Sequence, residues 1–338
     1  MDTEQASPRY ADIDLWEPAD ILHAMIEGQM AAVAAVRACV PAIEKAALAS
    51  EARLKEAGRL IYVGAGTSGR LAVQDGAELI PTFNWPKERL LLLMAGGKDA
   101  LLRSAENAED ETGEAIRAIQ HHKIGAPDVL IAVAASGTTP FTLTCLREAK
   151  KHGALTIGIA NNRDTPILAE ADCPIWLDTG PEPIAGSTRM KAGTAQRAAL
   201  NLLSSLVMIR LGRVHEGLMV DVQAINAKLQ RRSENILIRL TGRTTQEVRG
   251  ALERANGSVK LAVLLLHGCS FDEATRALDR AGGRLRTALK HLGGVATSAV
   301  LANEEELSPG VQAAGDDQNH MGEDNQNSGR KRKDHVGV

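Results

Sequence analysis

The sequence predicts an α/β fold in which a parallel sheet is covered by helices on both faces. Short apolar runs alternate with helix-like segments, glycine- and hydroxyl-rich turns follow three of these runs, and an all-helical stretch comes last. Alternating strands and helices are typical of a three-layer parallel sheet. The chain has 338 residues and is 44% hydrophobic. That length allows one sizeable core and a small second module.

The expected elements follow one another in a regular order. Apolar residues recur at helical spacing over 19–57, where Pro41 separates two helices. Five β-like runs come next, at residues 59–63, 90–94, 129–134, 155–159 and 175–177. A long helix is expected over 187–211, ending at Gly212. Shorter helices are expected at residues 245–255, 259–267, 272–280 and 283–290.

These elements divide the chain into four regions. Residues 1–57 form an N-terminal helical segment and residues 58–240 form the α/β domain. Residues 241–303 form a small helical module. Residues 304–338 are rich in Glu, Asp, Asn, Gln and Gly, so we expect a disordered tail there.

Composition argues against several classes of function. A net charge of −3 gives no attraction to nucleic acid or to an anionic membrane. No uninterrupted apolar run reaches about 18 residues, and the first 16 residues lack the regions of a signal peptide. The four cysteines are widely separated, and the nine histidines have no metal-ligand spacing. We therefore expect a cytoplasmic protein without a metal site that contacts neither nucleic acid nor membrane.

The first segment with chemical character is the loop Gly64-Ala-Gly-Thr-Ser-Gly-Arg70 after the first strand. Its glycines let backbone N–H groups approach an anion, and the start of the next helix adds partial positive charge. The three glycines also match the start of a dinucleotide fingerprint, which alone is a weak signal. Hydroxyl groups inside the loop favour a monophosphate instead. The candidate phosphate-binding residues of this loop are Gly66, Thr67 and Ser68.

Two further loops have the same character. Ser136, Gly137 and Thr139 follow the third strand, and Pro140 is placed to open a helix. Two such loops at one sheet edge can converge on one phosphate. The third loop precedes the long helix, with Ser187 and Thr188 as expected N-caps. The cations Arg189 and Lys191 lie in the first helical turn, where the helix dipole disfavours them unless an anion binds.

Two glutamates are candidates for acid–base chemistry. Glu78 is expected close to the first phosphate loop, and Glu109 lies in the segment Asn107-Ala-Glu-Asp110. Two carboxylates in different environments can divide the roles of acid and base between them. Composition alone is weak support for a catalytic role of this pair, because most acidic side chains in a protein are solvated.

Taken together, these segments resemble the N-acetylmuramic acid 6-phosphate etherases, a family built on the sugar isomerase (SIS) domain. The resemblance includes the Gly64–Arg70 loop, the segments around Glu78 and Glu109, and the second and third loops. It continues through Leu218-Met-Val-Asp-Val-Gln223, and Gly257-Ser-Val-Lys-Leu-Ala262 is similar to the family's UBA-like C-terminal module. Order and spacing agree over roughly residues 10–300.

The resemblance implies an SIS-type fold, a homodimer and a defined reaction. The family cleaves the D-lactyl ether of a phosphorylated amino sugar by elimination across C2–C3, followed by addition of water. The resemblance implies that Glu78 protonates the departing oxygen, and that Glu109 removes the C2 proton or activates the incoming water. The partner is a small sugar phosphate, and no metal or redox cofactor is required.

Two other classes of function remain open at this point. An SIS-type aldose–ketose isomerase would share the phosphate loops and a glutamate base. A non-catalytic sugar-phosphate sensor would need neither glutamate. A NAD-dependent enzyme is disfavoured, because Ala95-Gly-Gly97 follows the second strand where a ribose-binding acid is expected.

Overall fold

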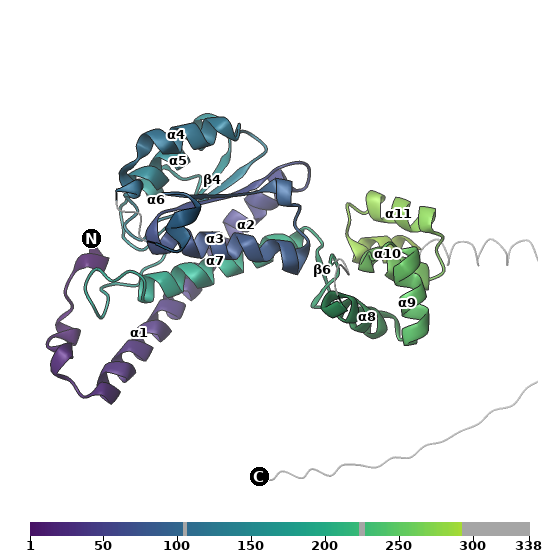
Figure 1. Ribbon diagram of the computed structural model, residues 1–338, viewed down its shortest axis with the longest axis horizontal. Coiled ribbons are helices and arrows are strands. Elements are labelled where there is room, and N and C mark those ends of the chain that lie inside the picture. Colours follow the sequence, from purple (N-terminus) through teal and green to yellow (C-terminus); the bar gives the residue numbers. More distant parts are fainter. Residues whose placement is uncertain (104–106, 223–226, 293–338) are drawn as a thin grey trace, which may run out of the picture. The chain divides into compact units, whose positions relative to one another are not determined.

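The computed structural model describes residues 1–103, 107–222 and 227–292. The expected tail at 304–338 and the last part of the expected helical module lie outside the described residues. Within the described part, the predicted α/β architecture is present (Figure 1).

The centre of the fold is a five-stranded parallel sheet with the order β2-β1-β3-β4-β5. Its strands are β1 (Leu60–Gly64), β2 (Leu90–Met94), β3 (Val129–Val133), β4 (Leu155–Ala160) and β5 (Cys173–Trp176). All five lie within about two residues of the runs expected from sequence. Strands β1 and β3 are buried along their whole length. Burial on both faces explains why they read as continuous apolar runs rather than alternating ones.

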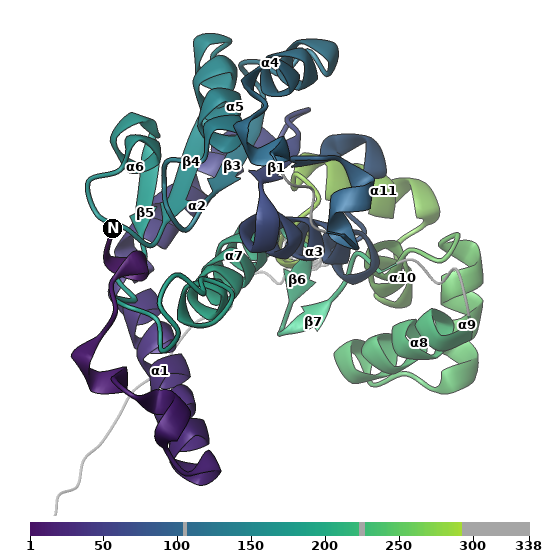
Figure 2. The same cartoon turned by 60° about the vertical axis from the view of Figure 1, so that its left-hand side comes forward.

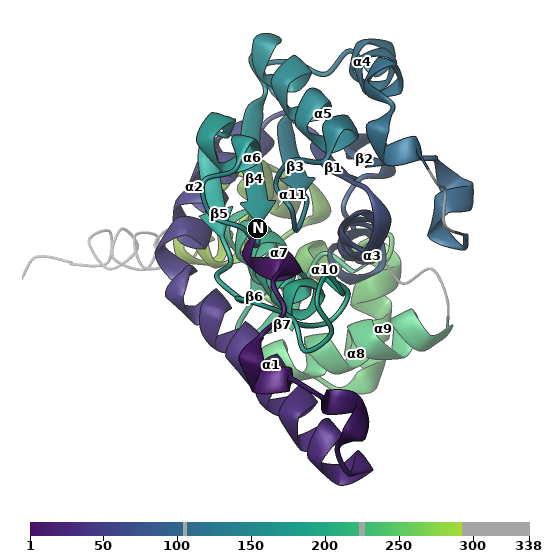
Figure 3. The same cartoon turned by 90° about the vertical axis from the view of Figure 1, so that its left-hand side faces the viewer.

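Helices cover both faces of the sheet, as Figure 3 shows. One face packs against α2 (Val40–Leu54), α3 (Gly66–Phe83) and α7 (Lys191–Arg210), and α1 (Pro18–Ala38) packs along α7. The opposite face packs against α4 (Thr112–His121), α5 (Pro140–Lys151) and α6 (Pro166–Glu170). Helices α3 and α7 lie side by side (Figure 2). The predicted three-layer arrangement is therefore confirmed.

Helix α1 presents much of its apolar surface to solvent. It packs along α7 through Ala32 and Val36, while Leu22, Ile26, Met30 and Val33 are each more than half exposed. By length and composition alone α1 is apolar enough to cross a membrane, which the sequence analysis did not anticipate. A single helix of this kind near the N-terminus is weak evidence for a span.

A helical module follows the α/β domain. A short hairpin of β6 (Val214–His215) and β7 (Leu218–Met219) leads to α8 (Ala227–Thr241), α9 (Thr245–Arg254), α10 (Val259–Leu266) and α11 (Phe271–Arg280). Helices α9 and α11 begin with complete capping boxes, at Thr244 and Ser270. The module has its own hydrophobic core, which includes Val220 and Leu237. Its core therefore draws on residues that precede the boundary expected at 241.

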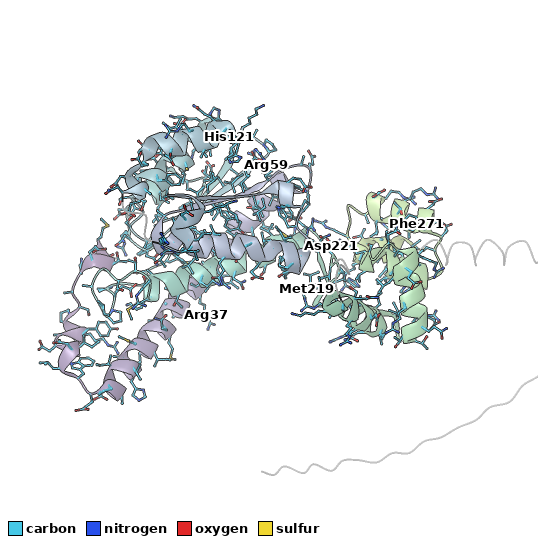
Figure 4. All side chains as sticks on the ribbon, in the orientation of Figure 1. Arg37, Arg59, His121, Met219, Asp221 and Phe271 are labelled. Carbon is cyan, nitrogen blue, oxygen red and sulfur yellow. The ribbon has the colours of Figure 1, made fainter. Side chains whose placement is uncertain are left out.

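A buried ion pair fixes the beginning of the central strands. Asp128, 1% exposed, accepts hydrogen bonds from the Arg59 side chain at 2.7 and 3.0 Å and from the Gly125 amide at 3.0 Å. Arg59 also donates to the carbonyl of His122, near His121 in Figure 4. Burial alone would raise the pKa of Asp128, but the hydrogen bonds from Arg59 and Gly125 lower it below its ordinary value. The charged pair therefore joins β1 to the segment before β3.

We predict that Asp128→Asn lowers the free energy of unfolding by about 3 kcal/mol at pH 7, because Arg59 loses its buried partner. The Asp128 pKa is lower in the folded state. Its contribution is therefore present above the ordinary aspartate pKa of about 4 and is lost as the pH falls through the folded pKa. Urea unfolding at pH 7 and at pH 3 measures both effects. Exposed Asp279→Asn is the control, and equal stability of the two variants at pH 7 would contradict the prediction.

Candidate functional site

A cavity of about 370 Å³ lies at the carboxyl ends of β1 and β3. The strand order reverses here, since β2 and β3 flank β1 on opposite sides. Such a switch point is where ligands bind to open parallel sheets. Of the residues expected to bind phosphate, the cavity is lined by Gly66, Thr67, Ser68, Ser136, Thr139 and Thr188.

Two helices begin at this cavity without a side-chain cap. Helix α3 starts at Gly66 and α5 at Pro140, and no side-chain hydrogen bond caps either N-terminus within the described residues. The first N–H groups of a helix have no partner inside the helix, and they carry partial positive charge. Two such ends beside one cavity suit an anion with several oxygens, such as a phosphate group.

Close backbone contacts fix the two loops. A Cβ atom on Gly64 would lie 2.7 Å from the Cα of Gly69, so the end of β1 touches the first turn of α3. Gly137 has φ +68°, and a Cβ there would lie 2.2 Å from the hydroxyl oxygen of Thr165. Neither loop tolerates a side chain at these positions. Close packing therefore holds the backbone of both loops in a defined arrangement beside the cavity.

The third loop is held by a carboxylate. Helix α7 begins at Lys191, four residues later than expected, and its N-terminus is capped by Glu182, 1% exposed. Glu182 accepts hydrogen bonds from the amides of Lys191 at 2.9 Å and Ala192 at 2.8 Å. The prediction that Ser187 and Thr188 cap this helix is therefore wrong. With the cap supplied by Glu182, Thr188 is left to line the cavity.

The two cations of the third loop do not line the cavity. Lys191 is buried, and its ammonium donates to the carbonyl of Thr179 at 2.7 Å. Burial lowers the pKa of Lys191, while the charge of Glu182 raises it in part. Arg189 is exposed, and Ser187 also lies outside the cavity lining. Within one chain, Ser187, Arg189 and Lys191 therefore do not line this cavity as the sequence led us to expect.

The two candidate glutamates lie apart. Glu109, in the short helical turn Ala108–Asp110, lines the cavity together with the phosphate loops. Glu78 is exposed on α3, about three helical turns or roughly 18 Å from the start of that helix. The expectation that Glu78 lies close to the first loop is therefore wrong. One chain alone does not bring Glu78 to Glu109.

The N-terminal segment contributes a residue that sequence reasoning missed. Glu4 lines the cavity, as does Asp110 next to Glu109. Thr3 is fully buried and holds Glu4 there: its amide donates to the Asn162 side chain at 3.2 Å, and its carbonyl accepts from the Gly186 amide at 3.0 Å. An acidic residue so far from the loops in sequence gave no local signal.

Metal ligands are not grouped in the part of the chain that the structure describes: no three His, Cys, Asp or Glu side chains there could hold an ion. The four cysteines are free. The site therefore offers backbone amides, hydroxyls and carboxylates as its chemical groups. These can bind a phosphate and move protons.

We predict that Glu182→Ala lowers the free energy of unfolding by about 1–2 kcal/mol, because the first amides of α7 lose their cap. Hydrogen exchange at the Lys191 and Ala192 amides should become faster. Glu182→Gln, which keeps one acceptor oxygen, should give an intermediate effect. Unchanged protection of both amides in Glu182→Ala would show that another group caps the helix.

Comparisons with known proteins place the chain among SIS-domain proteins. Residues 42–150 match the glucokinase regulatory protein N-terminal SIS domain, and residues 111–206 match the SIS domain. The phosphoheptose isomerase from Francisella tularensis has 19% identity and a TM-score of 0.43, covering 58% of this chain and 98% of its own.

Two curated relatives are much more similar. The N-acetylmuramic acid 6-phosphate etherase of Deinococcus radiodurans is 49% identical over 298 residues, covering 88% of this chain and 98% of the relative. The etherase of Geobacillus thermodenitrificans is 43% identical, covering 85% and 98%. The chain therefore belongs to the N-acetylmuramic acid 6-phosphate etherase family.

Proposed function

We propose that this protein is a carbon–oxygen lyase that cleaves the D-lactyl ether of N-acetylmuramic acid 6-phosphate. The products are N-acetylglucosamine 6-phosphate and D-lactate, which places the enzyme in the recycling of cell-wall amino sugars. The observation that carries the proposal is the cavity at the β1/β3 switch point. It combines two uncapped helix N-termini with the carboxylate of Glu109, and the relatives named above share most of the chain.

The phosphate of the substrate fits the loops after β1 and β3. The hydroxyls of Thr67, Ser68 and Thr139 line the same cavity as the uncapped helix starts. The Ser136 hydroxyl lies 3.2 Å from that of Thr139, so the second loop is held in one arrangement. Binding the sugar through its phosphate brings the rest of the molecule towards Glu109.

The reaction requires a base and an acid but no metal or redox cofactor. In the open-chain sugar, the C1 aldehyde acidifies the hydrogen on C2, so a carboxylate can remove it. The C3–O bond then breaks, and the departing lactyl oxygen takes up a proton because an ether oxygen is a poor leaving group. Water adds to the resulting double bond. Glu109 is the candidate for the C2 proton or the water, and Glu78 for the leaving oxygen.

The position of Glu78 leads to a shared active site. A hexosamine phosphate anchored at the first loop is shorter than the three helical turns that separate this loop from Glu78. We therefore propose a homodimer in which Glu78 of the partner subunit completes the cavity. The exposed apolar stripe on α1, formed by Leu22, Ile26, Met30 and Val33, is available to bury against the second copy. The free cysteines suit a cytoplasmic location.

We predict that unphosphorylated N-acetylmuramic acid is a very poor substrate. Hydrogen bonds to a charged group contribute about 1.5–3 kcal/mol each, so losing several weakens binding by orders of magnitude. Coupled detection of D-lactate with both sugars measures the difference in kcat/KM. Comparable turnover of the two sugars would contradict a phosphate-anchored substrate, and formation of a keto sugar instead of D-lactate would favour an isomerase.

We predict that Glu78→Gln and Glu109→Gln each reduce ether cleavage by ~10²–10⁴-fold, the usual contribution of a general acid or base. Glu78→Gln should retain exchange of the C2 hydrogen with solvent deuterium. Glu109→Gln should lose that exchange if Glu109 is the C2 base, or accumulate the unsaturated intermediate if it guides water. The exposed Glu88→Gln is the matched control, and melting curves test whether all three variants fold.

The shared active site predicts recovery of activity when the two variants are mixed. A dimer of one Glu78→Gln and one Glu109→Gln subunit has one site with both glutamates. Random exchange of subunits should therefore restore about a quarter of the wild-type activity. Native mass spectrometry verifies that mixed dimers form. Mixed dimers without any recovery would show that Glu78 and Glu109 do not come from different subunits.

A further inference from the structure

A second cavity of about 540 Å³ lies away from the candidate active site and shares no lining residue with it. It is formed where the end of α2, the segment before β2, and residues 280–284 at the end of α11 come together. Its volume is within the range of small-molecule sites. The cavity contains none of the residues that the proposed reaction uses.

Positive charge dominates this basic cavity. Its lining includes six cationic side chains, those of Lys55, Arg89, Arg213, Lys260, Arg280 and Arg284. Among the described lining residues, Asp221 is the only carboxylate, and it pairs with Arg213 at 3.3 Å and Lys260 at 2.8 Å. Asp221 is labelled in Figure 4.

Two further carboxylates next to the cavity are already engaged. Glu51 pairs with Lys55, with Arg284, and with Arg210 outside the cavity. The charge of Glu88 acts on Arg89. Among the described residues, seven cations at or next to the cavity are therefore accompanied by three carboxylates, which leaves an excess of positive charge.

The central cations are held in fixed positions. The guanidinium groups of Arg89 and Arg213 lie 4.5 and 5.0 Å from the ring centre of Trp85, which is 1% exposed. Arg89 also donates to the carbonyl of Gly58, and Arg213 to the carbonyl of Phe83. Stacking on Trp85 and hydrogen bonds to backbone carbonyls therefore orient both guanidinium groups, and these contacts do not neutralise their charge.

Burial makes this arrangement costly without a counter-ion. It lowers the pKa of Arg89, and the neighbouring charge of Arg213 lowers it further. Burial also lowers the pKa of Arg213 and of Lys260, although Asp221 opposes both shifts. An anion that enters the cavity relieves the repulsion between these groups.

We propose that the basic cavity binds a small phosphate-bearing anion at a site separate from the active site. A phosphate group carries more than one negative charge and several acceptor oxygens, which match a set of guanidinium donors. Lys260, Arg280 and Arg284 belong to the C-terminal helical module, whereas Lys55, at the end of α2, and Arg89, before β2, belong to the part of the chain that surrounds the sheet. The bound anion therefore links the two parts of the chain.

Arg280 is the cation best placed to respond to such a ligand. It is exposed and lines the cavity, and within the described residues its side chain has a hydrogen bond to the carbonyl of Arg276 but no ion pair with a carboxylate. Its replacement should therefore weaken anion binding without removing a contact that the fold needs. Arg276, exposed one turn earlier on α11 and outside the cavity, is the matched control.

Trp85 provides a local signal for the test. In a full-length chain with Trp16→Phe and Trp176→Phe, Trp85 is the remaining tryptophan, and its fluorescence should change saturably as pyrophosphate is added. Arg280→Ser should weaken this binding by roughly ten-fold to a hundred-fold, the contribution of a hydrogen bond to a charged group. Arg276→Ser should leave it unchanged. Equilibrium dialysis of pyrophosphate with the unmodified chain, alone and with Arg280→Ser, repeats the comparison without the tryptophan changes.

Three probes distinguish the source of the phosphate. Binding of inorganic phosphate and pyrophosphate supports recognition of the phosphoryl group alone. Binding of N-acetylglucosamine 6-phosphate only, with the same dependence on Arg280, supports a site for a phosphorylated sugar. The proposal is overturned if none of the probes gives a saturable Trp85 signal, or if Arg280→Ser and Arg276→Ser weaken binding equally. Etherase activity should be the same in both arginine variants. The binding test therefore stands on its own, even if the protein proved to lack etherase activity.

Discussion

The candidate site depends on the reversal of strand order between β1 and β3. Because β2 lies on one side of β1 and β3 on the other, the helices that follow β1 and β3 leave towards opposite faces of the sheet. Their N-termini nevertheless begin beside the same cavity. Two partial positive charges and two uncapped helix starts therefore converge, and no cationic side chain lines the cavity among the described residues.

In this arrangement the backbone and the side chains offer different chemical groups to the cavity. The backbone of the two loops offers helix N-termini to the cavity, and contacts such as those of Gly64 with Gly69 keep it in place. The carboxylates that suit proton transfer come from outside the two loops, as Glu109 does.

Much of the fold could be predicted from sequence, because each central strand is an apolar run and glycine- and hydroxyl-rich turns follow three of these runs. The β2 run was correct at both ends, and the first two phosphate loops follow from the rule that ligands bind at the carboxyl ends of strands. The rest depends on contacts that are distant in sequence. Glu182 caps a helix nine residues away, and this leaves Lys191 to bind the Thr179 carbonyl rather than a ligand. Helix α8 was not anticipated, because only four of its residues are buried.

The anchoring of Thr3 has a consequence for the order in which the protein folds. Thr3 leaves the ribosome early, but its partner Asn162 is 159 residues further along the chain, and Gly186 is further still. Closing so long a loop is slow, and it requires that β4 and the segment before α7 have already formed. The wall of the cavity that carries Glu4 therefore assembles only after the sheet that supports it is complete.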